Sequence, residues 1–195
     1  MYKVFTFAPE NLAQNTETST NRDGGAMDVT TPDVPAPRIH GMQGQTWSET
    51  IRTDAQYFEM AFPRVLAVAE RAWHRAEWER DWTMGEQYNP TTGLVDMDAL
   101  AADYHGFATK LGCHEMRKLE RLGIAYRVPP PGGRIEGGTL AANSELPCTD
   151  ILYSLDGGAW KNYVEPVRVG DDVAVSLMSV SPEGNLMNRV VVVES

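Results

Sequence analysis

Apolar residues recur at intervals of three and four between residues 53 and 73, which is the pattern of one buried helical face. These residues are Phe58, Phe62, Val65, Leu66, Ala69 and Trp73. Thr53-Asp54-Ala55-Gln56 has the form of a capping box, with Thr53 as the cap and Gln56 reaching back to the backbone. Pro63 interrupts the pattern because it removes a backbone donor. We therefore expect a short turn before Pro63 and a main helix from Pro63, at its first position, to about Trp73.

A second and longer helix is indicated between about Asp96 and Leu122. One apolar stripe runs along it, made of Leu100, Tyr104, Phe107, Leu111, Leu119 and Leu122. Gly123 follows directly, and glycine is common just past a helix end because it adopts a left-handed backbone conformation without strain. The pattern predicts that the helix stops at Gly123.

The residues before these helices show little periodicity. Residues 11–40 are rich in Asn, Thr, Asp, Gly and Pro. So long an irregular stretch in a compact domain is generally functional or lies over a surface. A short buried strand suits Ile39 to Thr46.

The character of the chain changes after Gly123. The Pro/Gly-rich segment Val128 to Gly133 is typical of a linker between domains. Beyond it the alternation predicts two hairpins, 151–155 with 160–164 and 173–180 with 189–193. Several short strands with no long helix among them indicate a small antiparallel β-sandwich. The sequence therefore predicts an α+β protein whose domains are residues 1–126 and 127–195.

Composition and charge narrow the possible partners. The 195 residues are 42% hydrophobic with a mean hydropathy of −0.36, as in folded globular proteins. Lys and Arg number 17 against 27 Asp and Glu, giving a formal charge of −10. Such a surface repels phosphate backbones and anionic membranes, so nucleic acid is not expected as a partner. No apolar run approaches the ~20 residues that a membrane-spanning helix needs.

The compartment is left open by the residues themselves. Cys113 and Cys148 permit one disulfide at most and match no metal-ligand spacing. The first nine residues lack the apolar stretch and cleavage site of a signal peptide. A cytosolic protein and a fragment whose export signal lies upstream both fit these observations.

The most informative stretch for chemistry is Gly41-Met42-Gln43-Gly44-Gln45-Thr46-Trp47-Ser48-Glu49. Its small residues suit a tightly packed strand, which then ends in an aromatic ring and a carboxylate. In a β/α barrel, strand ends of this kind form the active-site face. Trp47 can stack on a sugar ring and Glu49 can accept hydrogen bonds from hydroxyls, and their i, i+2 spacing predicts that both side chains share one face. The alternative is that Trp47 is a core residue and Glu49 a charge at a helix start.

Other candidate sites are weaker. The four histidines, His40, His74, His105 and His114, share no spacing that would place three ligands on one metal. No Ser, Cys and His arrangement suggests a nucleophile relay. The glycine pairs lack the companions of a phosphate-binding loop, so turns explain them. No metal or organic cofactor is expected.

The chain resembles glycoside hydrolase family 20, and its bacterial chitobiase-like members in particular. The resemblance is specific between Trp47 and Trp73, looser in the sandwich, and covers nearly the whole chain. The stretches that carry it are Tyr2 to Leu12, Glu17-Thr18 with Arg22-Asp23-Gly24, Gly41 to Glu49, Phe62-Pro63-Arg64 and Ala69-Glu70-Arg71-Ala72-Trp73 with His74-Arg75-Ala76.

The resemblance implies a fold and substrate-binding roles for two residues. Residues 1–126 would be the last strand and helices of a (β/α)8 catalytic barrel, and residues 127–195 an immunoglobulin-like β-sandwich. The residue matching Trp47 walls the pocket of the 2-acetamido group, and the one matching Glu49 binds the 4- and 6-hydroxyls of an N-acetylhexosamine glycan. The resemblance also implies a periplasmic or cell-envelope location and the rest of the barrel upstream.

The catalytic groups of that family are not in this chain. Its enzymes, β-N-acetylhexosaminidases, use substrate-assisted retention, in which an Asp orients the acetamide and the adjacent Glu protonates the leaving oxygen. The sequence contains no adjacent Asp-Glu pair. We therefore expect no catalytic residue here and no activity from this chain alone. The rival interpretations are a non-catalytic carbohydrate-binding or interaction module and an autonomous structural protein; an Asp-Glu pair upstream would favour the enzyme.

Overall fold

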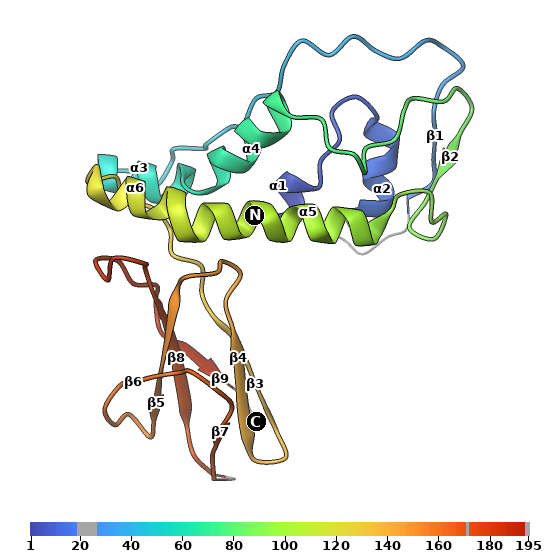
Figure 1. Ribbon diagram of the computed structural model, residues 1–195. Helices are drawn as coiled ribbons and strands as arrows, with labels where there is room; N and C mark the ends of the chain where they lie inside the picture. Colours follow the sequence, from blue (N-terminus) through green and yellow to red (C-terminus); the bar gives the residue numbers. More distant parts are fainter. Residues whose placement is uncertain (19–26, 171, 194–195) are drawn as a thin grey trace. The chain divides into compact units, whose positions relative to one another are not determined.

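The computed structural model describes residues 1–18, 27–170 and 172–193, and it is a mixed α+β structure (Figure 1). The motif Arg22-Asp23-Gly24 lies outside the described residues. The chain forms two compact units. The first unit comprises Met1–Glu49 and Ala61–Gly106, and the second comprises Thr50–Met60 and Phe107–Ser195. No helix in the described residues is long and apolar enough to cross a membrane.

The first unit is built from short elements around aromatic side chains. Its elements are α1 (Tyr2–Phe5), η1 (Leu12–Gln14), α2 (Asn15–Thr18), β1 (Val29–Thr30), α4 (Arg64–Trp73), β2 (Gln87–Tyr88) and α5 (Met97–Lys110) up to Gly106. Strands β1 and β2 pair antiparallel. The Phe5 ring lies 5.3 Å from the Tyr104 ring and 6.4 Å from the Trp78 ring, centroid to centroid. Phe5 is the buried residue of α1, and its ring attaches this short helix to the rest of the unit.

Polar side chains hold the irregular segments of the first unit. The Glu17 carboxylate accepts hydrogen bonds from the backbone N–H groups of Leu94 and Val95, each at 3.0 Å. The Asn11 amide donates to the Tyr88 hydroxyl at 3.0 Å. The two Glu17 bonds pair backbone groups that no helix or sheet satisfies, and the Asn11–Tyr88 bond joins two distant side chains.

Helix α4 begins one residue later than expected, with Pro63 as its N-cap, and its buried face differs from the prediction. The predicted stripe is half-buried at Phe62 and Leu66 and exposed at Val65, Ala69 and Trp73. The helix instead buries Ala67 and Arg71, four residues apart on the other side. The stripe prediction was wrong because an ion pair of Arg71, covered by aromatic rings, occupies the side that periodicity marked as polar.

The predicted strand from Ile39 to Thr46 is not formed. These residues have no regular structure. A strand requires a neighbour to receive its backbone hydrogen bonds. None of the described residues runs alongside this segment as a ladder partner, so the local pattern alone does not make it a strand.

The first segment of the second unit, Thr50–Met60, contains all but the last residue of helix α3 (Asp54–Ala61), which is longer than the predicted short turn before Pro63. The predicted capping box is present, except that the Gln56 side chain binds the backbone N–H of the residue before the cap. The Gln56 N–H donates to Thr53 Oγ1 at 3.2 Å, and the Gln56 side-chain oxygen accepts from the Arg52 N–H at 2.7 Å. Both ends of the motif thus satisfy backbone donors that the helix start leaves unpaired.

The predicted long helix is confirmed, with an internal change of winding. It consists of α5, a π-helical turn η2 (Leu111–Glu115) and α6 (Met116–Arg121). The Asp96 carboxylate caps its start, and Gly123 ends it with φ +70°. The N–H of Ile124 donates to the Leu119 carbonyl at 2.9 Å and that of Gly123 to the Glu120 carbonyl at 3.0 Å. This is the Schellman arrangement that the position of Gly123 predicts.

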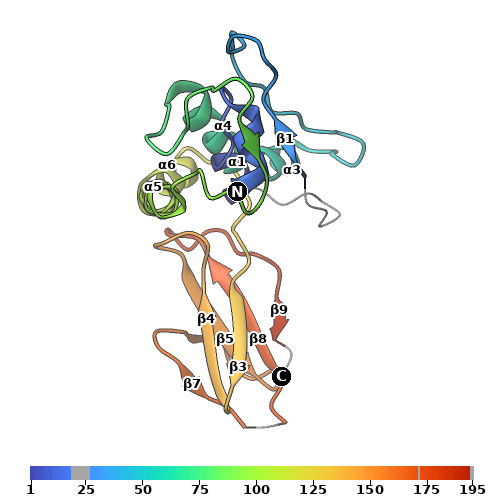
Figure 2. The same ribbon diagram turned by 90° about the vertical axis from the view of Figure 1, so that its right-hand side faces the viewer.

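Two antiparallel sheets follow, and the described residues contain no helix after α6 (Figures 1 and 2). The first has the order β3-β4-β7, from β3 (Gly132–Glu136), β4 (Thr139–Asn143) and β7 (Val167–Arg168). The second has the order β6-β5-β8-β9, from β5 (Asp150–Leu155), β6 (Lys161–Asn162), β8 (Val175–Val180) and β9 (Val191–Val193). One core joins them, formed by Leu140 of the first sheet with Ile151, Val175, Leu177 and Val193 of the second.

Both predicted hairpins are present in this unit, with β6, β8 and β9 shorter than predicted and β5 one residue longer. Tyr153 pairs with Lys161 across the first, and Val175 pairs with Val193 across the second. The hairpin of β3 and β4 was not predicted, since its first residues were assigned to the linker. A Cβ at Gly133 would lie 2.4 Å from Leu177 Cδ1, so this glycine permits close packing of a strand on the core.

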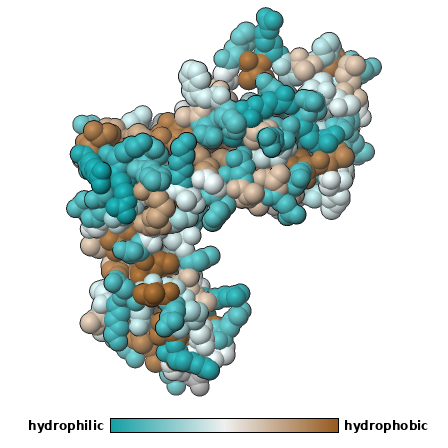
Figure 3. Space-filling view, viewed as in Figure 1, coloured by the Kyte–Doolittle hydropathy of each residue, from teal (hydrophilic) through white to brown (hydrophobic). Residues whose placement is uncertain are grey.

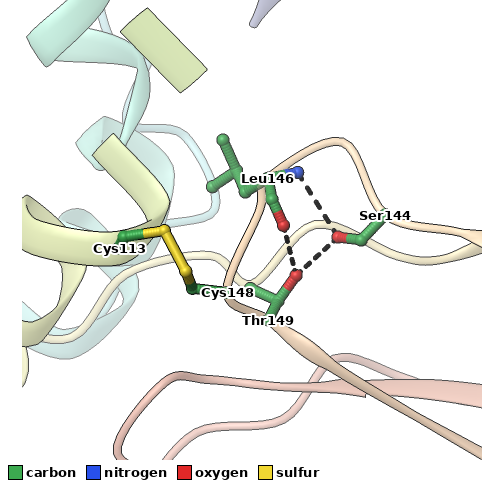
Figure 4. Close-up of a disulfide and its surroundings, with 5 residues drawn as sticks. All are labelled: Cys113, Ser144, Leu146, Cys148 and Thr149. Carbon is green, nitrogen blue, oxygen red and sulfur yellow. Dashed lines mark hydrogen bonds between the residues drawn. A yellow bond between two sulfur atoms is a disulfide. The ribbon is translucent and has the colours of Figure 1, made fainter. Parts of the chain in front are cut away.

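Cys113 and Cys148 form a disulfide that joins η2 to the connection before β5 (Figure 4). Their Cα atoms are 5.1 Å apart. Beside it, the Leu146 N–H donates to Ser144 Oγ at 3.3 Å, and the Thr149 hydroxyl donates to the Leu146 carbonyl at 2.6 Å. The connection is therefore fixed covalently and by its own hydrogen bonds.

The Glu120 carboxylate makes a second attachment between helix and strands inside this unit. It accepts hydrogen bonds from the Tyr126 hydroxyl at 2.7 Å and the Ser181 hydroxyl at 2.8 Å. Arg117 and Arg121 of the same helix both bind Glu183 at 3.1 Å. These contacts hold α6 against the turn between β8 and β9.

Candidate functional site

The segment that contains Trp47 and Glu49 lies between β1 and α3 and is irregular. Within the first unit it passes close to α4, since a Cβ at Gly44 would lie 3.5 Å from Val68 Cγ2. The Trp82 indole N–H donates to the Val34 carbonyl at 3.0 Å and ties down the start of the same loop. The loop is thus held by side chains at its start and by close packing near its end.

Both predicted site residues are exposed. The Trp47 side chain is 71% exposed, so it is not the core residue of the alternative interpretation. Glu49 is exposed and lies outside the first turn of α3, which begins at Asp54 behind the Thr53 cap. A carboxylate so placed gains little from the helix dipole, whose effect is confined to the first turn. Neither core packing of Trp47 nor a position of Glu49 at a helix start accounts for these two residues.

Apolar surface is not confined to this loop. The face seen in Figure 3 shows hydrophobic residues scattered among a larger number of hydrophilic ones. Trp73, at the end of α4, is 92% exposed and Val65 is 42% exposed. An exposed tryptophan alone therefore does not define a sugar site in this chain, and the adjacent carboxylate is the distinguishing feature of Trp47.

A buried ion pair in the first unit was missed by sequence reasoning. Arg71 Nη1 lies 2.9 Å from Glu79 Oε1, and the two side chains are 0% and 2% exposed. The Arg71 guanidinium carbon lies 4.7 Å from the centre of the Phe5 ring and 5.3 Å from that of Trp78. Burial raises the pKa of Glu79, although the Ala76 N–H and the Arg71 charge oppose that change. The sequence feature that could have indicated this ion pair is two opposite charges, Arg71 and Glu79, placed eight residues apart near the end of a helix.

Two cavities differ in whether the buried polar atoms of their lining residues have hydrogen-bond partners. One of about 260 Å³ in the first unit is bounded by Arg71 and Glu79 among others. One of about 410 Å³ in the second unit is bounded by α3, residues 126–130 and residues 186–189. Among the described residues, only the first has a wall residue with buried nitrogens that lack a hydrogen-bond partner, namely Arg71. Among those residues no group of three His, Cys, Asp or Glu is placed to hold a metal ion.

Comparison with known proteins identifies the class. Residues 1–76 match the family described as glycosyl hydrolase family 20, catalytic domain. Residues 115–190 match the chitobiase/beta-hexosaminidase C-terminal domain. The chain thus matches glycosyl hydrolase family 20 in two parts, a segment of the catalytic domain and the chitobiase/beta-hexosaminidase C-terminal domain.

Individual relatives agree with this assignment. The chain is 46% identical over 96% of its length to N,N'-diacetylchitobiase of Vibrio harveyi, and 40% identical over 93% to a beta-hexosaminidase of Vibrio vulnificus. Beta-hexosaminidase B of Pseudoalteromonas piscicida is 38% identical over 56% of the chain. The chain spans only 21%, 22% and 15% of the lengths of these relatives.

Proposed function

We propose that this chain is the C-terminal part of a β-N-acetylhexosaminidase. That enzyme would remove terminal N-acetylhexosamine from β-linked glycans such as chitobiose by substrate-assisted retaining hydrolysis. The observation that supports this most strongly is the exposed pair Trp47 and Glu49 within the part that matches the catalytic domain. Trp47 would wall the acetamido pocket and Glu49 would bind ring hydroxyls.

The finer architecture belongs to the same proposal. Residues 1–126 would complete a (β/α)8 barrel whose other strands precede this chain, and residues 127–195 would be an immunoglobulin-like domain. Ile39 to Thr46 would become the last barrel strand once neighbours pair with its backbone. The two sheets around one core are consistent with a sandwich, which many cell-surface domains share.

A periplasmic or cell-envelope location is part of the proposal as well. The Cys113–Cys148 disulfide supports it, because disulfides persist in oxidising compartments and are rare in the cytosol. No metal or organic cofactor is required by the proposed reaction, in which the substrate's own acetamide supplies the nucleophile.

This chain alone should not hydrolyse the substrate. Trp47 and Glu49 supply binding, and binding that is equal in ground and transition states does not accelerate bond cleavage. Proton delivery to the leaving oxygen, typically worth ~10²–10⁴-fold, would come from a carboxylic acid upstream. Glu49 would contact hydroxyls remote from the scissile bond and does not replace that acid.

The test uses the chain and a version extended upstream to the length of its relatives. With a chromogenic N-acetylglucosaminide, the extended enzyme should be active and the chain silent. In the extended enzyme, Glu49→Gln should lower kcat/KM by about 10- to 100-fold, because a charged hydrogen bond to substrate is weakened. Trp47→Ala should reduce kcat/KM by a similar factor.

A matched control makes the outcome specific. Glu77→Gln removes another exposed carboxylate of the same unit and should leave kcat/KM within about twofold. Turnover by the chain alone that depended on Glu49 would overturn the proposal. An extended chain that binds N-acetylglucosamine without hydrolysing it would instead identify a non-catalytic carbohydrate-binding protein.

A further inference from the structure

The cavity of about 410 Å³ in the second unit has walls that hydrogen bonds hold in place. Gln56 in its first wall belongs to the cap at the start of α3. Tyr126 in its second wall donates to the Glu120 carboxylate at 2.7 Å. In its third wall, Asn188 Oδ1 accepts from the Ser179 N–H at 2.5 Å. The cavity is therefore formed without a ligand, and its volume lies in the range of about 300–1,000 Å³ that is usual for small-molecule sites.

The charged residues that line this cavity have no oppositely charged partner. They are Arg127, Arg189 and Glu59, and all three are exposed. Among the residues that the structure describes, none of the three forms a salt bridge. Two cations against one carboxylate give the cavity a local charge of +1, although the chain as a whole carries −10. A concave surface with a local excess of positive charge attracts anions.

The rest of the lining suits a ligand that has both hydroxyl groups and an apolar face. Glu59 supplies acceptor oxygens, and the Gln56 side-chain nitrogen has no hydrogen-bond partner in the part of the chain that the structure describes. Apolar surface comes from Ile51, Met60, Val128 and Met187. Hydroxyls both donate and accept hydrogen bonds, and the C–H groups of a sugar ring pack against flexible apolar side chains such as Met. The cavity therefore contains partners for an anionic group, for hydroxyls and for C–H groups.

We propose that this cavity binds a sugar acid, a small hydroxylated ligand that carries one carboxylate. The carboxylate would bind the guanidinium groups of Arg127 and Arg189, whose planar donors match its geometry. Hydroxyls of the ligand would donate to Glu59. One negative charge neutralises the local +1, whereas a phosphate ester of about −1.5 to −2 would leave a negative excess beside Glu59. A neutral sugar would leave both guanidinium groups without an anionic partner.

Isothermal titration calorimetry of the whole chain with sodium glucuronate tests the proposal, and it requires no turnover. Glucuronate should bind saturably, one molecule per chain, and glucose and inorganic phosphate should each bind at least about tenfold more weakly. Arg127→Gln and Arg189→Gln should each weaken glucuronate binding by about 10- to 100-fold, because a charge-assisted hydrogen bond is lost. Arg134→Gln is the matched control, an exposed arginine of the same unit that does not line the cavity, and it should leave Kd within about twofold.

Glu59→Gln separates recognition of the sugar from recognition of the carboxylate. The change removes a negative charge beside the ligand, so sodium acetate should bind more tightly, while the preference for glucuronate over acetate should fall by about tenfold. The proposal is overturned if the unaltered chain does not bind glucuronate, or if glucose or phosphate binds as tightly. Glucuronate binding that survives replacement of both Arg127 and Arg189 would overturn it as well. None of these outcomes depends on the hydrolase reaction, so failure of either proposal leaves the other standing.

Discussion

The two units differ in how completely they satisfy their own buried polar atoms. In the described part of the first unit, partners are lacking for Thr6 Oγ1, Asn11 Oδ1, Gln14 Nε2 and both Nε and Nη2 of Arg71. In the described part of the second unit, Ser179 Oγ is the single such atom. Folded proteins leave few buried polar groups unpaired. The first unit is therefore short of partners, and the second is nearly self-sufficient.

Exposed apolar side chains occur in both units, for example Trp47 and Trp73 in the first and Leu122, Val164 and Val192 in the second. The second unit encloses a core between two sheets and closes it with a disulfide. In the first unit, α4 leaves Val65 and Trp73 exposed while it buries Arg71. Missing partners for buried polar groups are what a piece of a larger domain would show. The comparisons agree, since the chain spans only 21% and 22% of the lengths of two of the relatives that it matches.

Removal of the disulfide should have the largest effect on this comparison. The bond joins residues 35 apart in sequence, and closing a loop of that size is worth about 4 kcal/mol in the chain-entropy description. Replacing both Cys113 and Cys148 by Ser should lower the unfolding free energy of the second unit by about that amount. Urea unfolding followed by hydrogen exchange and mass spectrometry would measure each unit separately.

Reduced wild-type chain is the matched control and should behave like the double variant. If the first unit lost as much stability as the second, the two units would share one cooperative transition. That result would contradict the view that the two units differ in how far their own contacts stabilise them.

The sequence predicted the second unit better than the first because its elements are specified locally. The Thr53-Gln56 cap, the Gly123 stop and the 156–158 turn each depend on a few neighbouring residues, and all three are present. The β3–β4 hairpin was missed because Gly133 is required by contact with Leu177, which is 44 positions away in the sequence numbering. Periodicity carries no information about such contacts.

In the first unit, local patterns failed where the structure depends on distant partners. The strand predicted for Ile39 to Thr46 needs neighbouring strands, and none lies among the described residues. The apolar stripe of α4 was assigned to the wrong side because Arg71 is buried through Glu79 and Phe5. Exposure of Trp47 was compatible with its predicted role, whereas that role itself came from family resemblance and stays a proposal.

A pair of glycines in the long helix gives an intermediate effect. A Cβ at Gly112 would lie 2.1 Å from the Pro147 carbonyl oxygen, whereas one at Gly106 would meet no atom within 4 Å. Gly112→Ala should therefore destabilise the second unit by about 2 kcal/mol through overpacking. Gly106→Ala should stabilise by up to about 1 kcal/mol because alanine favours the helix. Thermal melts of the two variants would measure both, and equal effects would show that the helix does not pack closely on the Pro147 connection.

The smallest expected effect concerns two carboxylates whose pKa shifts have opposite signs. Burial alone would raise the pKa of Glu120, but hydrogen bonds from Tyr126 and Ser181 outweigh it and lower the pKa below its ordinary value of 4.5. Burial raises the pKa of Glu79 above the same reference value. Folding thus shifts Glu120 of the second unit toward its charged form and Glu79 of the first unit toward its neutral form, each relative to the reference value.

These shifts predict opposite pH dependence. Glu120 contributes stability that is present above pH 4.5 and is lost as pH falls through its lowered folded pKa. Glu79 contributes stability that is present below pH 4.5 and is lost as pH rises through its raised folded pKa. Acidification from pH 6 should therefore weaken the second unit through Glu120, while Glu79 partly protects the first.

Glu120→Gln should cost the second unit about 1 kcal/mol at pH 7 and flatten its response to acid, because the amide keeps an acceptor oxygen but no charge. Glu79→Gln should flatten the first unit's response and leave the second unchanged. Hydrogen exchange at pH 4 and pH 6 would report each unit, and the same acid response in both units, unaltered by either variant, would contradict the assignment of these two carboxylates.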